Sequence, residues 1–350
     1  MIDCAAQRPG MLLFQPPQTD AEQPAHLRYH TTRGEPQPPQ AITSQPTDGI
    51  VHLARWNGAS FDALAECWEH RLDVVISSGA RIAALVTHYA SPRSEQLHLR
   101  RTLYRAQRDP QWCVDTVRMI IDRKIGNQLA LLRLYHDHPD IAWERDTPLA
   151  REASWGERYT TALRRLRACR QSLPEARSME SLRGLEGQAA RVYFGSWPPL
   201  IAQSDFRRRA RALADPTNLL LDLCYARLAH RTTLHLLDCG LDSAAGMLHA
   251  DDDGRPSLAL DLMEPLRPLI ADRFCLRLIR QRHQEWFEEP GPDGRWQLTQ
   301  AGWRQLNERW KAWLYGSGQR PGVDTLIAHT VHGFARWISH AEPLDLPRLR

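Results

Sequence analysis

Lysine is almost missing from this sequence of 350 residues: Lys124 and Lys311 are the only two, and arginine carries nearly all of the positive charge. Arginine binds phosphate through a planar fork of N–H donors, and the formal net charge of +4 weakly indicates a polyanionic partner. A GC-rich genome produces the same excess of arginine. Composition alone therefore leaves both explanations open.

Three other features are lacking. No apolar run approaches the length of a membrane span, and the first ten residues contain no basic stretch followed by an apolar one. The seven cysteines form no Cys-x-x-Cys pair, which argues against a zinc site and against a disulfide framework. No Walker loop, Gly-x-Gly-x-x-Gly or Gly-x-Ser-x-Gly motif occurs. We expect a cytoplasmic protein that does not enter a membrane.

The length favours two domains, and the composition changes along the chain. Residues 1–92 are expected to form a small, mainly β N-terminal domain, although the first 48 residues are rich in proline and glutamine. Ser60 is a candidate N-cap for a helix that ends near His70. The segments with strand character are Met11–Phe14, Ile50–Trp56, Val74–Ile76 and Ile82–Val86.

Residues 93–350 show helical periodicity and are expected to form a larger all-α catalytic domain, which makes the fold class α+β and multidomain. A short strand is expected at Trp296–Leu298. The expected helices are Asp115–His136, Arg158–Ser172, Met179–Phe194, Asp215–Cys239, Pro265–Phe287 and Thr299–Leu314.

Two segments of the helical domain place a candidate site residue among small residues. Glu186 lies between glycines in Gly184–Phe194, which suits a site where a bulky ligand approaches a helix. A solvated glutamate at a helix start explains the same residues. His249 ends the glycine-bearing loop Gly240–His249, after a long helix. Its imidazole can bind a metal or a phosphate, or it can satisfy the loop backbone.

A third segment carries an acidic pair. Asp261 and Glu264 are three residues apart, which places both carboxylates on one side of a helical turn. Pro265 predicts that a helix begins near Met263 or Glu264 and points its N-terminus at the site, with Arg267 one turn on and able to contact phosphate. Apolar neighbours indicate partial burial, which is costly for a carboxylate pair unless a cation or a hydrogen-bond donor compensates it. This favours a metal over surface charge and leaves an arginine-paired structural cluster open.

Two carboxylates and one histidine are suitable ligands for Mg²⁺ or Mn²⁺. Such an ion orients a phosphodiester, stabilises charge on its oxygens and activates a hydroxyl nucleophile. The sequence therefore predicts metal-dependent phosphodiester transfer.

In this order, the three segments resemble those of the CRISPR-associated spacer-acquisition integrases, the Cas-one family. The family motifs Gly-x-Glu-Gly-x-x-Ala-x-x-Tyr-Phe, Gly-Leu-Asp-x-x-x-Gly-x-x-His and Asp-Leu-x-Glu-x-x-Arg-Pro are matched by Gly184–Phe194, Gly240–His249 and Asp261–Pro268. Further matches are Asp215-Pro216 with Asn218 and Tyr225, Arg123–Gln128, and Trp296–Thr299 with Gly302. The resemblance covers the chain from about Val51 to Leu314.

This resemblance implies roles for individual residues. Glu186, His249 and Glu264 are expected to ligate Mg²⁺ or Mn²⁺, and Asp261 is the neighbouring acid of the catalytic group. The DNA-binding positions that it implies are Arg267, Asn218 and Tyr225.

The resemblance also implies an activity. Members of the family are integrases and endonucleases that insert spacer DNA into the CRISPR array, the adaptation stage of antiviral defence. They are homodimers that join two copies of a small Cas-two partner in a heterohexamer and hold double-stranded DNA (protospacer and CRISPR repeat). Each DNA 3′-hydroxyl then attacks the repeat in a transesterification that needs no ATP.

Two alternatives are kept. A transposon-encoded integrase of the same fold predicts an added helix-turn-helix module, and none is evident in the sequence. A non-catalytic DNA-binding scaffold has no reason to retain all three expected ligands. The first 48 residues depart from the regular β-sandwich with which family members open, and in those relatives this region mediates the dimer contacts.

Overall fold

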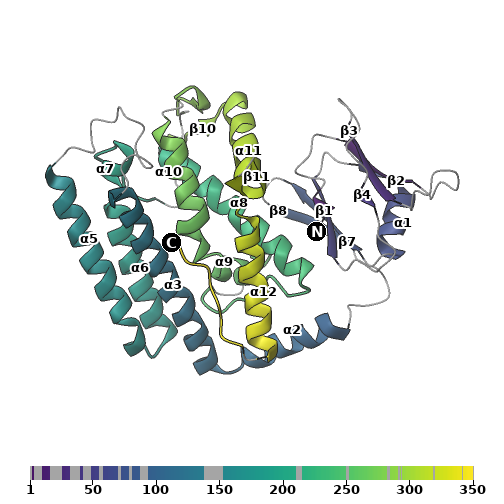
Figure 1. Ribbon diagram of the computed structural model, residues 1–350, viewed down its shortest axis with the longest axis horizontal. Coiled ribbons are helices and arrows are strands. Elements are labelled where there is room, and N and C mark those ends of the chain that lie inside the picture. Colours follow the sequence, from purple (N-terminus) through teal and green to yellow (C-terminus); the bar gives the residue numbers. More distant parts are fainter. Residues whose placement is uncertain are drawn as a thin grey trace. The chain divides into compact units, whose positions relative to one another are not determined.

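The structure is a computed structural model, and it divides into two compact units: one of residues 1–100 and 233–242, the other of residues 101–232 and 243–350 (Figure 1). It describes the chain outside residues 1, 4–9, 16–25, 32–39, 42–48, 55–57, 70–71, 79–80, 87–93, 138–152, 210–214, 250–251, 282–283, 291, 293, 318–319, 341 and 350.

The first unit contains two four-stranded sheets and a helix. One sheet has the order β1 (Ile2–Asp3), β5 (Gly49–Ala54), β7 (Leu72–Ser78), β8 (Arg81–Val86), and the other has the order β4 (Gln40–Ala41), β3 (His26–Thr31), β2 (Gly10–Gln15), β6 (Gly58–Ala59). Helix α1 (Phe61–Glu69) is capped by Ser60, whose Oγ accepts the N–H of Ala63 at 3.2 Å. The hydrophobic core of the first unit includes Val51, Leu53, Ala63, Cys67, Leu72 and Val74.

Most of the strands predicted in this unit are confirmed. The segments around Met11 and Ile50 form β2 and β5, and the two later segments form β7 and β8, which pair in antiparallel fashion. Strand β3 was not predicted, because its sequence His-Leu-Arg-Tyr-His-Thr is polar and offers little hydrophobic alternation. Its pairing with β2 over six residues stabilises β3 as a strand although its own sequence pattern does not predict one. The predicted ends at Trp56 and His70 lie outside the described residues.

The end of α8 (Pro216–Asp238) belongs to the first unit. Its Leu234 and Leu237 pack with Val75 and Ile82 of the β7–β8 pair. Gly240 ends this helix in the left-handed region at φ +79°, a conformation that favours glycine after the end of a helix. The units therefore divide near residue 100 and include 233–242 in the first, whereas the expected domains divided between residues 92 and 93.

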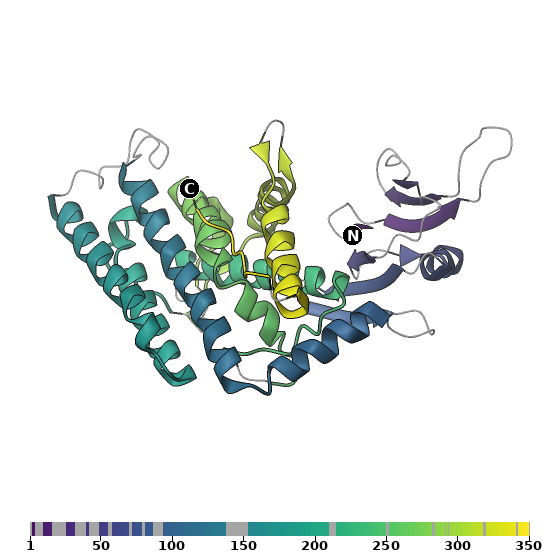
Figure 2. The same cartoon turned by 60° about the horizontal axis from the view of Figure 1, so that its bottom comes forward.

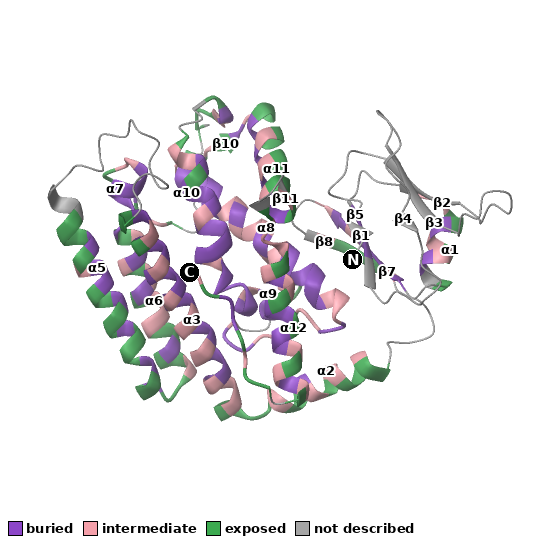
Figure 3. Ribbon diagram, viewed as in Figure 1, coloured by how far each residue is buried: buried purple, intermediate pink, exposed green. Residues whose placement is uncertain are grey.

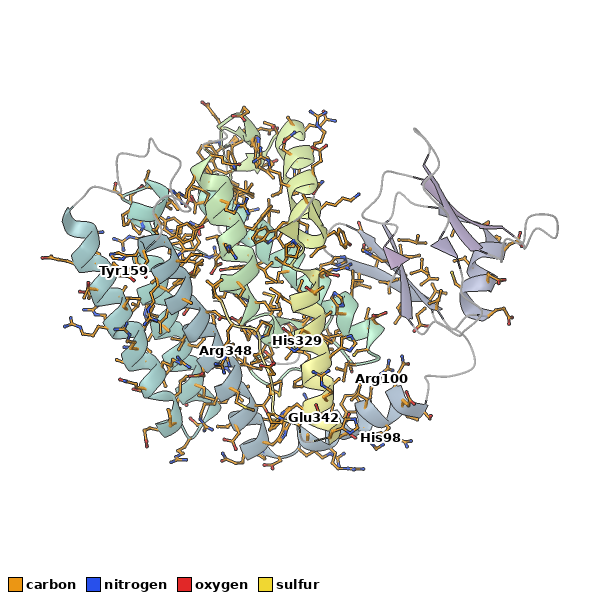
Figure 4. The ribbon with its side chains drawn as sticks, in the orientation of Figure 1. His98, Arg100, Tyr159, His329, Glu342 and Arg348 are labelled. Carbon is orange, nitrogen blue, oxygen red and sulfur yellow. The ribbon has the colours of Figure 1, made fainter. Side chains whose placement is uncertain are left out.

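The second unit is mostly helical, as expected. Helices α3, α5 and α6 lie side by side in two views (Figures 1 and 2). Tyr159 of α5, labelled in Figure 4, stacks on His136 of α3 with 3.8 Å between ring centroids. The helices are α2 (Ser94–Ala106, which begins in the first unit), α3 (Pro110–Asp137), α5 (Ala153–Gln171), α6 (Met179–Gly195), α7 (Pro198–Ile201), α9 (Ser257–Leu262), α10 (Arg273–Arg280), α11 (Gln300–Tyr315) and α12 (Asp324–His340).

Short elements complete this unit and depart from an all-α domain. Two-stranded ladders pair β9 (Phe287–Glu288) with β10 (Gln297–Leu298) and β11 (Gly316–Ser317) with β12 (Arg320–Pro321). The first confirms the strand predicted near Trp296. The remaining short helices are η2 (Leu173–Glu175), η3 (Arg267–Asp272) and η4 (Gln284–Trp286).

The helix predicted over Pro265–Phe287 is wrong at both ends. Helix α9 begins eight residues earlier, at Ser257, and a turn at Met263–Pro265 leads into η3, a π-helix, and then α10, which ends at Arg280. Pro265 and Pro268 have no N–H to donate to a preceding turn, which interrupts the regular ladder here. Glu264 therefore lies in the turn between α9 and η3, whose N-cap is Leu266, and the predicted helix start near Met263 or Glu264 is wrong.

A C-terminal segment that the sequence did not predict runs back from α12 towards α3 (Figures 1 and 2), where Arg348 is labelled in Figure 4. Asn127 of α3 donates to the carbonyls of Pro347 (3.0 Å) and Pro265 (2.8 Å) and accepts the N–H of Leu349 (3.1 Å). One buried side chain thus ties this segment to the turn that carries Glu264. Within the described part of the chain, no helix is long and apolar enough to cross a membrane.

Candidate active site

Helix α6 presents Glu186. The helix is capped by Ser178, whose Oγ accepts the N–H of Ser181 at 3.1 Å. A Cβ added to Gly184 or Gly187 would meet nothing within 4 Å, so packing does not require these glycines. The side chain of Glu186 is 26% exposed. The space predicted around this carboxylate is therefore present.

The loop that carries His249 is packed tightly against its neighbours. A Cβ on Gly246 would lie 2.5 Å from Cβ of Ser257 and 2.8 Å from the carbonyl oxygen of His249, so only glycine fits. Arg183 of α6 donates two hydrogen bonds to the carbonyl of Leu248, at 2.6 and 3.1 Å. The loop is thereby joined to the helix of Glu186.

The carboxylate of Asp261 accepts hydrogen bonds from the backbone of this loop. Its Oδ2 accepts the N–H groups of Met247 (2.6 Å) and Leu248 (3.0 Å). Its Oδ1 accepts the N–H of His249 (3.0 Å) and lies 2.6 Å from Nδ1 of the imidazole. The Asp261 side chain is 0% exposed, and α9 lies among buried segments (Figure 3). With all its hydrogen-bonding capacity used in this way, Asp261 orients His249 and leaves Nε2 directed away from it.

Glu264 is the second buried carboxylate, with 4% of its side chain exposed. Its Oε1 lies 3.0 Å from Nη2 of Arg267 and 3.9 Å from Nε2 of His249, and its Oε2 lies 2.5 Å from Nζ of Lys124. Burial alone would raise the pKa of Glu264, but the charges of Arg267 and Lys124 outweigh it and hold that pKa below its usual range. Glu264 is therefore ionised at neutral pH.

Lys124 is the site residue whose role the sequence did not reveal. It projects from α3, and its ammonium makes ion pairs with both Glu186 and Glu264. Burial would lower the pKa of Lys124, yet these two carboxylates raise it above its ordinary value. The sequence did carry a signal at this position, because Lys124 lies in Arg123–Gln128, one of the segments that match the Cas-one family.

The expected ligands have the chemical groups that a divalent cation prefers, but their present spacing is not that of a formed metal site. Within the described part of the chain, no three His, Cys, Asp or Glu side chains form a ready metal cluster. However, one cation, the ammonium of Lys124, already bridges two of the three expected ligands, and His249 adjoins the second of these. Apart from that ion pair, the buried Oε2 of Glu264 has no hydrogen-bond partner. Oxygen donors with one imidazole fit Mg²⁺ or Mn²⁺.

Arg267, Tyr225 and Asp272 form a network beside the carboxylates. The guanidinium of Arg267 lies 4.6 Å from the ring centroid of Tyr225, whose hydroxyl donates to Oδ1 of Asp272 at 2.6 Å. Tyr193 donates to Oδ2 at 3.0 Å. The sequence did not predict a role for Asp272. It lies five residues after Arg267, and the π-helix η3 brings these two residues to one face.

Asp272 predicts a pH-dependent stability. Burial raises its pKa from 3.8 to about 6, against the opposing effect of the hydrogen bonds from Tyr225 and Tyr193 and of the charges of Arg267 and Lys124. Between these values the folded protein holds a proton that the unfolded chain has lost, so stability falls as pH rises through this window. The asparagine in Asp272→Asn cannot ionise, so this variant should not show the decrease of about 3 kcal/mol in the free energy of unfolding.

The measurement is the free energy of unfolding in urea, taken in half-unit steps from about pH 4 to about pH 7. The difference between the variant and the wild type should grow in favour of Asp272→Asn across that window and then level off. Parallel curves would show that Asp272 does not titrate as described.

Asn218 is placed differently from its expected role in DNA contact. It is fully buried near the start of α8. Its Oδ1 accepts from Nη1 of Arg208 (2.9 Å) and from the N–H of Arg209 (2.8 Å), and its Nδ2 donates to Asp215 (2.6 Å) and to the carbonyl of Arg207 (2.9 Å). All of its polar atoms are used, so in this arrangement it supports the arginine-bearing loop instead of facing a ligand.

A cavity of about 640 Å³ adjoins the carboxylates. Its wall joins acidic and basic groups of the site to aromatic side chains, and Tyr225 faces it. The lining residues include Lys124, Glu186, Phe194, Phe206, Arg207, Arg208, Tyr225, Arg267 and Asp272.

Comparison with known proteins gives consistent matches. A family model described as CRISPR associated protein Cas1 matches residues 28–312. The chain is 37% identical over 225 residues to "CRISPR-associated endonuclease Cas1 2" of Rhodospirillum rubrum, which covers 63% of this chain and 62% of the relative. It is 37% identical over 240 residues to "CRISPR-associated endonuclease Cas1 1" of Chlorobaculum tepidum, which covers 67% of this chain and 66% of the relative. The aligned part thus spans less than two thirds of each relative.

Solved structures share the fold. A casposase bound to integration product matches with a TM-score of 0.66 and 19% identity, over 99% of this chain and 98% of that one. A Cas1 protein from Thermotoga maritima matches with a TM-score of 0.64 and 16% identity, over 97% of both chains. Since the family model covers most of the sequence and two curated relatives are 37% identical to it, this chain belongs to the family of CRISPR associated protein Cas1.

Proposed function

We propose that this protein is a metal-dependent DNA integrase and endonuclease that inserts spacer DNA into a CRISPR array. The observation that carries the proposal is the pairing of Glu186 and Glu264 through one buried cation, with His249 beside Glu264, at the edge of a cavity with arginine in its wall. The names of the two curated relatives describe endonucleases.

In this proposal Glu186, His249 and Glu264 hold one Mg²⁺ or Mn²⁺ ion. Asp261 belongs to the catalytic group as the residue that positions His249. When bound, the ion orients the phosphodiester and offsets negative charge on its oxygens. Asp261 keeps Nε2 of the imidazole available by engaging Nδ1. Arg267 and Tyr225, both in the cavity wall, are the proposed DNA contacts.

The reaction is a transesterification. The 3′-hydroxyl oxygen of the incoming DNA forms a bond to a phosphorus of the CRISPR repeat, and the bond from that phosphorus to the 3′ oxygen of the repeat breaks. The attacking hydroxyl loses a proton and the leaving oxygen gains one. The number of phosphodiesters is unchanged, so no ATP is consumed.

The proposed partners follow from the family. They are double-stranded DNA (protospacer and repeat), a second copy of this chain, and the small Cas2 protein in a heterohexamer. Structural neighbours include a partial Cas6-RT-Cas1–Cas2 complex, with a TM-score of 0.70 and 18% identity. We place this activity in the prokaryotic cytoplasm, where the DNA lies.

Strand transfer tests this function. A labelled duplex with 3′-hydroxyl ends is incubated with a repeat-containing plasmid, the protein and Mg²⁺ or Mn²⁺, with Cas2 added in a parallel reaction. We expect label to enter the plasmid only with the metal and only from 3′-hydroxyl ends. No transfer, with DNA binding intact, would favour the non-catalytic scaffold.

A transposon-encoded integrase remains the second candidate because the casposase shares the fold. Its 19% identity is well below the 37% to the curated Cas1 relatives. Transfer into repeat-containing and repeat-free plasmids separates the two, since a CRISPR integrase should prefer the repeat.

Arg267→Ala should weaken DNA binding and reduce its salt dependence. One phosphate contact fewer lowers the magnitude of the slope of log K against log salt concentration by about 1. The measurement is fluorescence anisotropy of a labelled duplex over a salt series. Arg304→Ala, at an exposed position on α11, is the matched control and should keep the wild-type slope. An unchanged slope for Arg267→Ala would make that arginine structural.

A further inference from the structure

The ammonium of Lys124 lies between two carboxylates that come from different elements. Glu186 projects from α6 and Glu264 from the turn after α9, while Lys124 itself projects from α3. Its side chain is 7% exposed. Two carboxylates this close repel each other when no cation lies between them, and a buried charge is costly without a partner. Each of the three charged groups therefore depends on the others.

The ammonium of Lys124 and a divalent ion would need the same carboxylate oxygens. Within the group of four ion-paired side chains, Lys124 and Arg267 supply two positive charges, and Glu186 and Glu264 supply two negative ones. A divalent cation bound by the same carboxylates would lie close to the ammonium, and like charges repel each other strongly in a buried site. This repulsion is relieved most simply if the ammonium leaves the carboxylates when the ion arrives.

We propose that Lys124 is an internal counter-cation: it holds Glu186 and Glu264 together in the metal-free protein and competes with the divalent ion for the same two carboxylates. Lys124 is thus a positioning residue that keeps the ligands assembled and sets how tightly the metal binds. The competition rests on the proposed function for the identity of the metal ligands, whereas the ion pairs do not.

The scarcity of lysine makes this inference directly measurable in the wild-type protein. Lys311, on α11, is the only other lysine and is exposed, so it is an internal reference. Amine modification of the full-length protein, read by peptide mass spectrometry, reports each lysine separately. In metal-free buffer Lys124 should be protected and Lys311 modified.

Saturating Mg²⁺ should raise the modification rate of Lys124 by about fivefold or more, because its partners are taken, and should leave that of Lys311 unchanged. Continued protection of Lys124 with Mg²⁺ bound would overturn the proposal. This arm needs no variant and does not depend on catalytic activity.

Metal affinity is the second arm. Mn²⁺ binding, followed by electron paramagnetic resonance, should be about tenfold tighter in Lys124→Met than in the wild type, because a competing charge is removed. Lys311→Met is the matched control and should bind like the wild type. If Lys124→Met does not fold, Lys124→Gln keeps a polar side chain without the charge.

The outcomes separate the two proposals. Equal Mn²⁺ affinity in Lys124→Met and Lys311→Met would overturn the competition and leave the proposed function standing. Absence of Mn²⁺ binding by folded wild-type protein would contradict both the competition and the metal in the proposed function.

Discussion

Replacing Glu186 with glutamine is expected to abolish strand transfer, with a loss of about a thousandfold or more. Glutamine keeps the shape of the side chain but removes one negative charge from a set of three expected metal ligands. It also removes one partner of the ammonium of Lys124. The measurement is the initial rate of label entry into the repeat-containing plasmid at saturating Mn²⁺.

Glu180→Gln is the matched control for this prediction. Glu180 lies in the first turn of the same helix, α6, and is exposed. The control should transfer strands at the wild-type rate. Glu186→Gln leaves the buried Lys124 with one carboxylate partner, so both variants are assayed at a temperature where each is folded. Comparable activity in the two variants would remove Glu186 from the site.

The second large effect concerns stability as well as activity. Asp261→Asn should lower the free energy of unfolding by about 3 kcal/mol, since the amide nitrogen cannot accept the backbone N–H groups that one carboxylate oxygen now accepts. Strand transfer should fall about a hundredfold even in the folded protein, because the imidazole of His249 loses the group that orients it. The measurements are urea unfolding and the transfer rate at a temperature where the variant is folded.

The control is Asp253→Asn, at an exposed position in the turn before α9. It should change the free energy of unfolding by no more than about 0.5 kcal/mol and should leave the transfer rate at the wild-type value. If Asp261→Asn were as stable and active as this control, the hydrogen bonds from residues 247–249 would be unimportant for the site.

Much of the helical unit was predictable because its helices are long and periodic. The helix around Glu186 was placed within one residue at its C-terminal end, and the three motifs do meet. The turn after α9 was not predictable from the pattern Glu264-Pro265: proline is accepted at a helix start, yet here it follows a helix that had already begun at Ser257. The carbonyl of Pro265 accepts a hydrogen bond from Asn127 of α3, a tertiary contact that the local sequence does not encode.

The roles of individual polar residues depended on tertiary contacts. Asn218 and Tyr225 lie on one helix, and their sequence context does not distinguish a side chain that supports a loop from one that faces a cavity. Lys124 acquires its partners from residues 62 and 140 positions away. No local pattern reports such contacts, so the counter-cation emerged only from the structure.

The central claim is that Glu186, His249 and Glu264 hold one divalent ion. Anomalous diffraction from crystals of the protein grown with Mn²⁺ tests it directly. We expect one manganese peak about 2.2 Å from carboxylate oxygens of Glu186 and Glu264 and from Nε2 of His249. A manganese peak elsewhere in the protein, with Lys124 still between the two carboxylates, would contradict it.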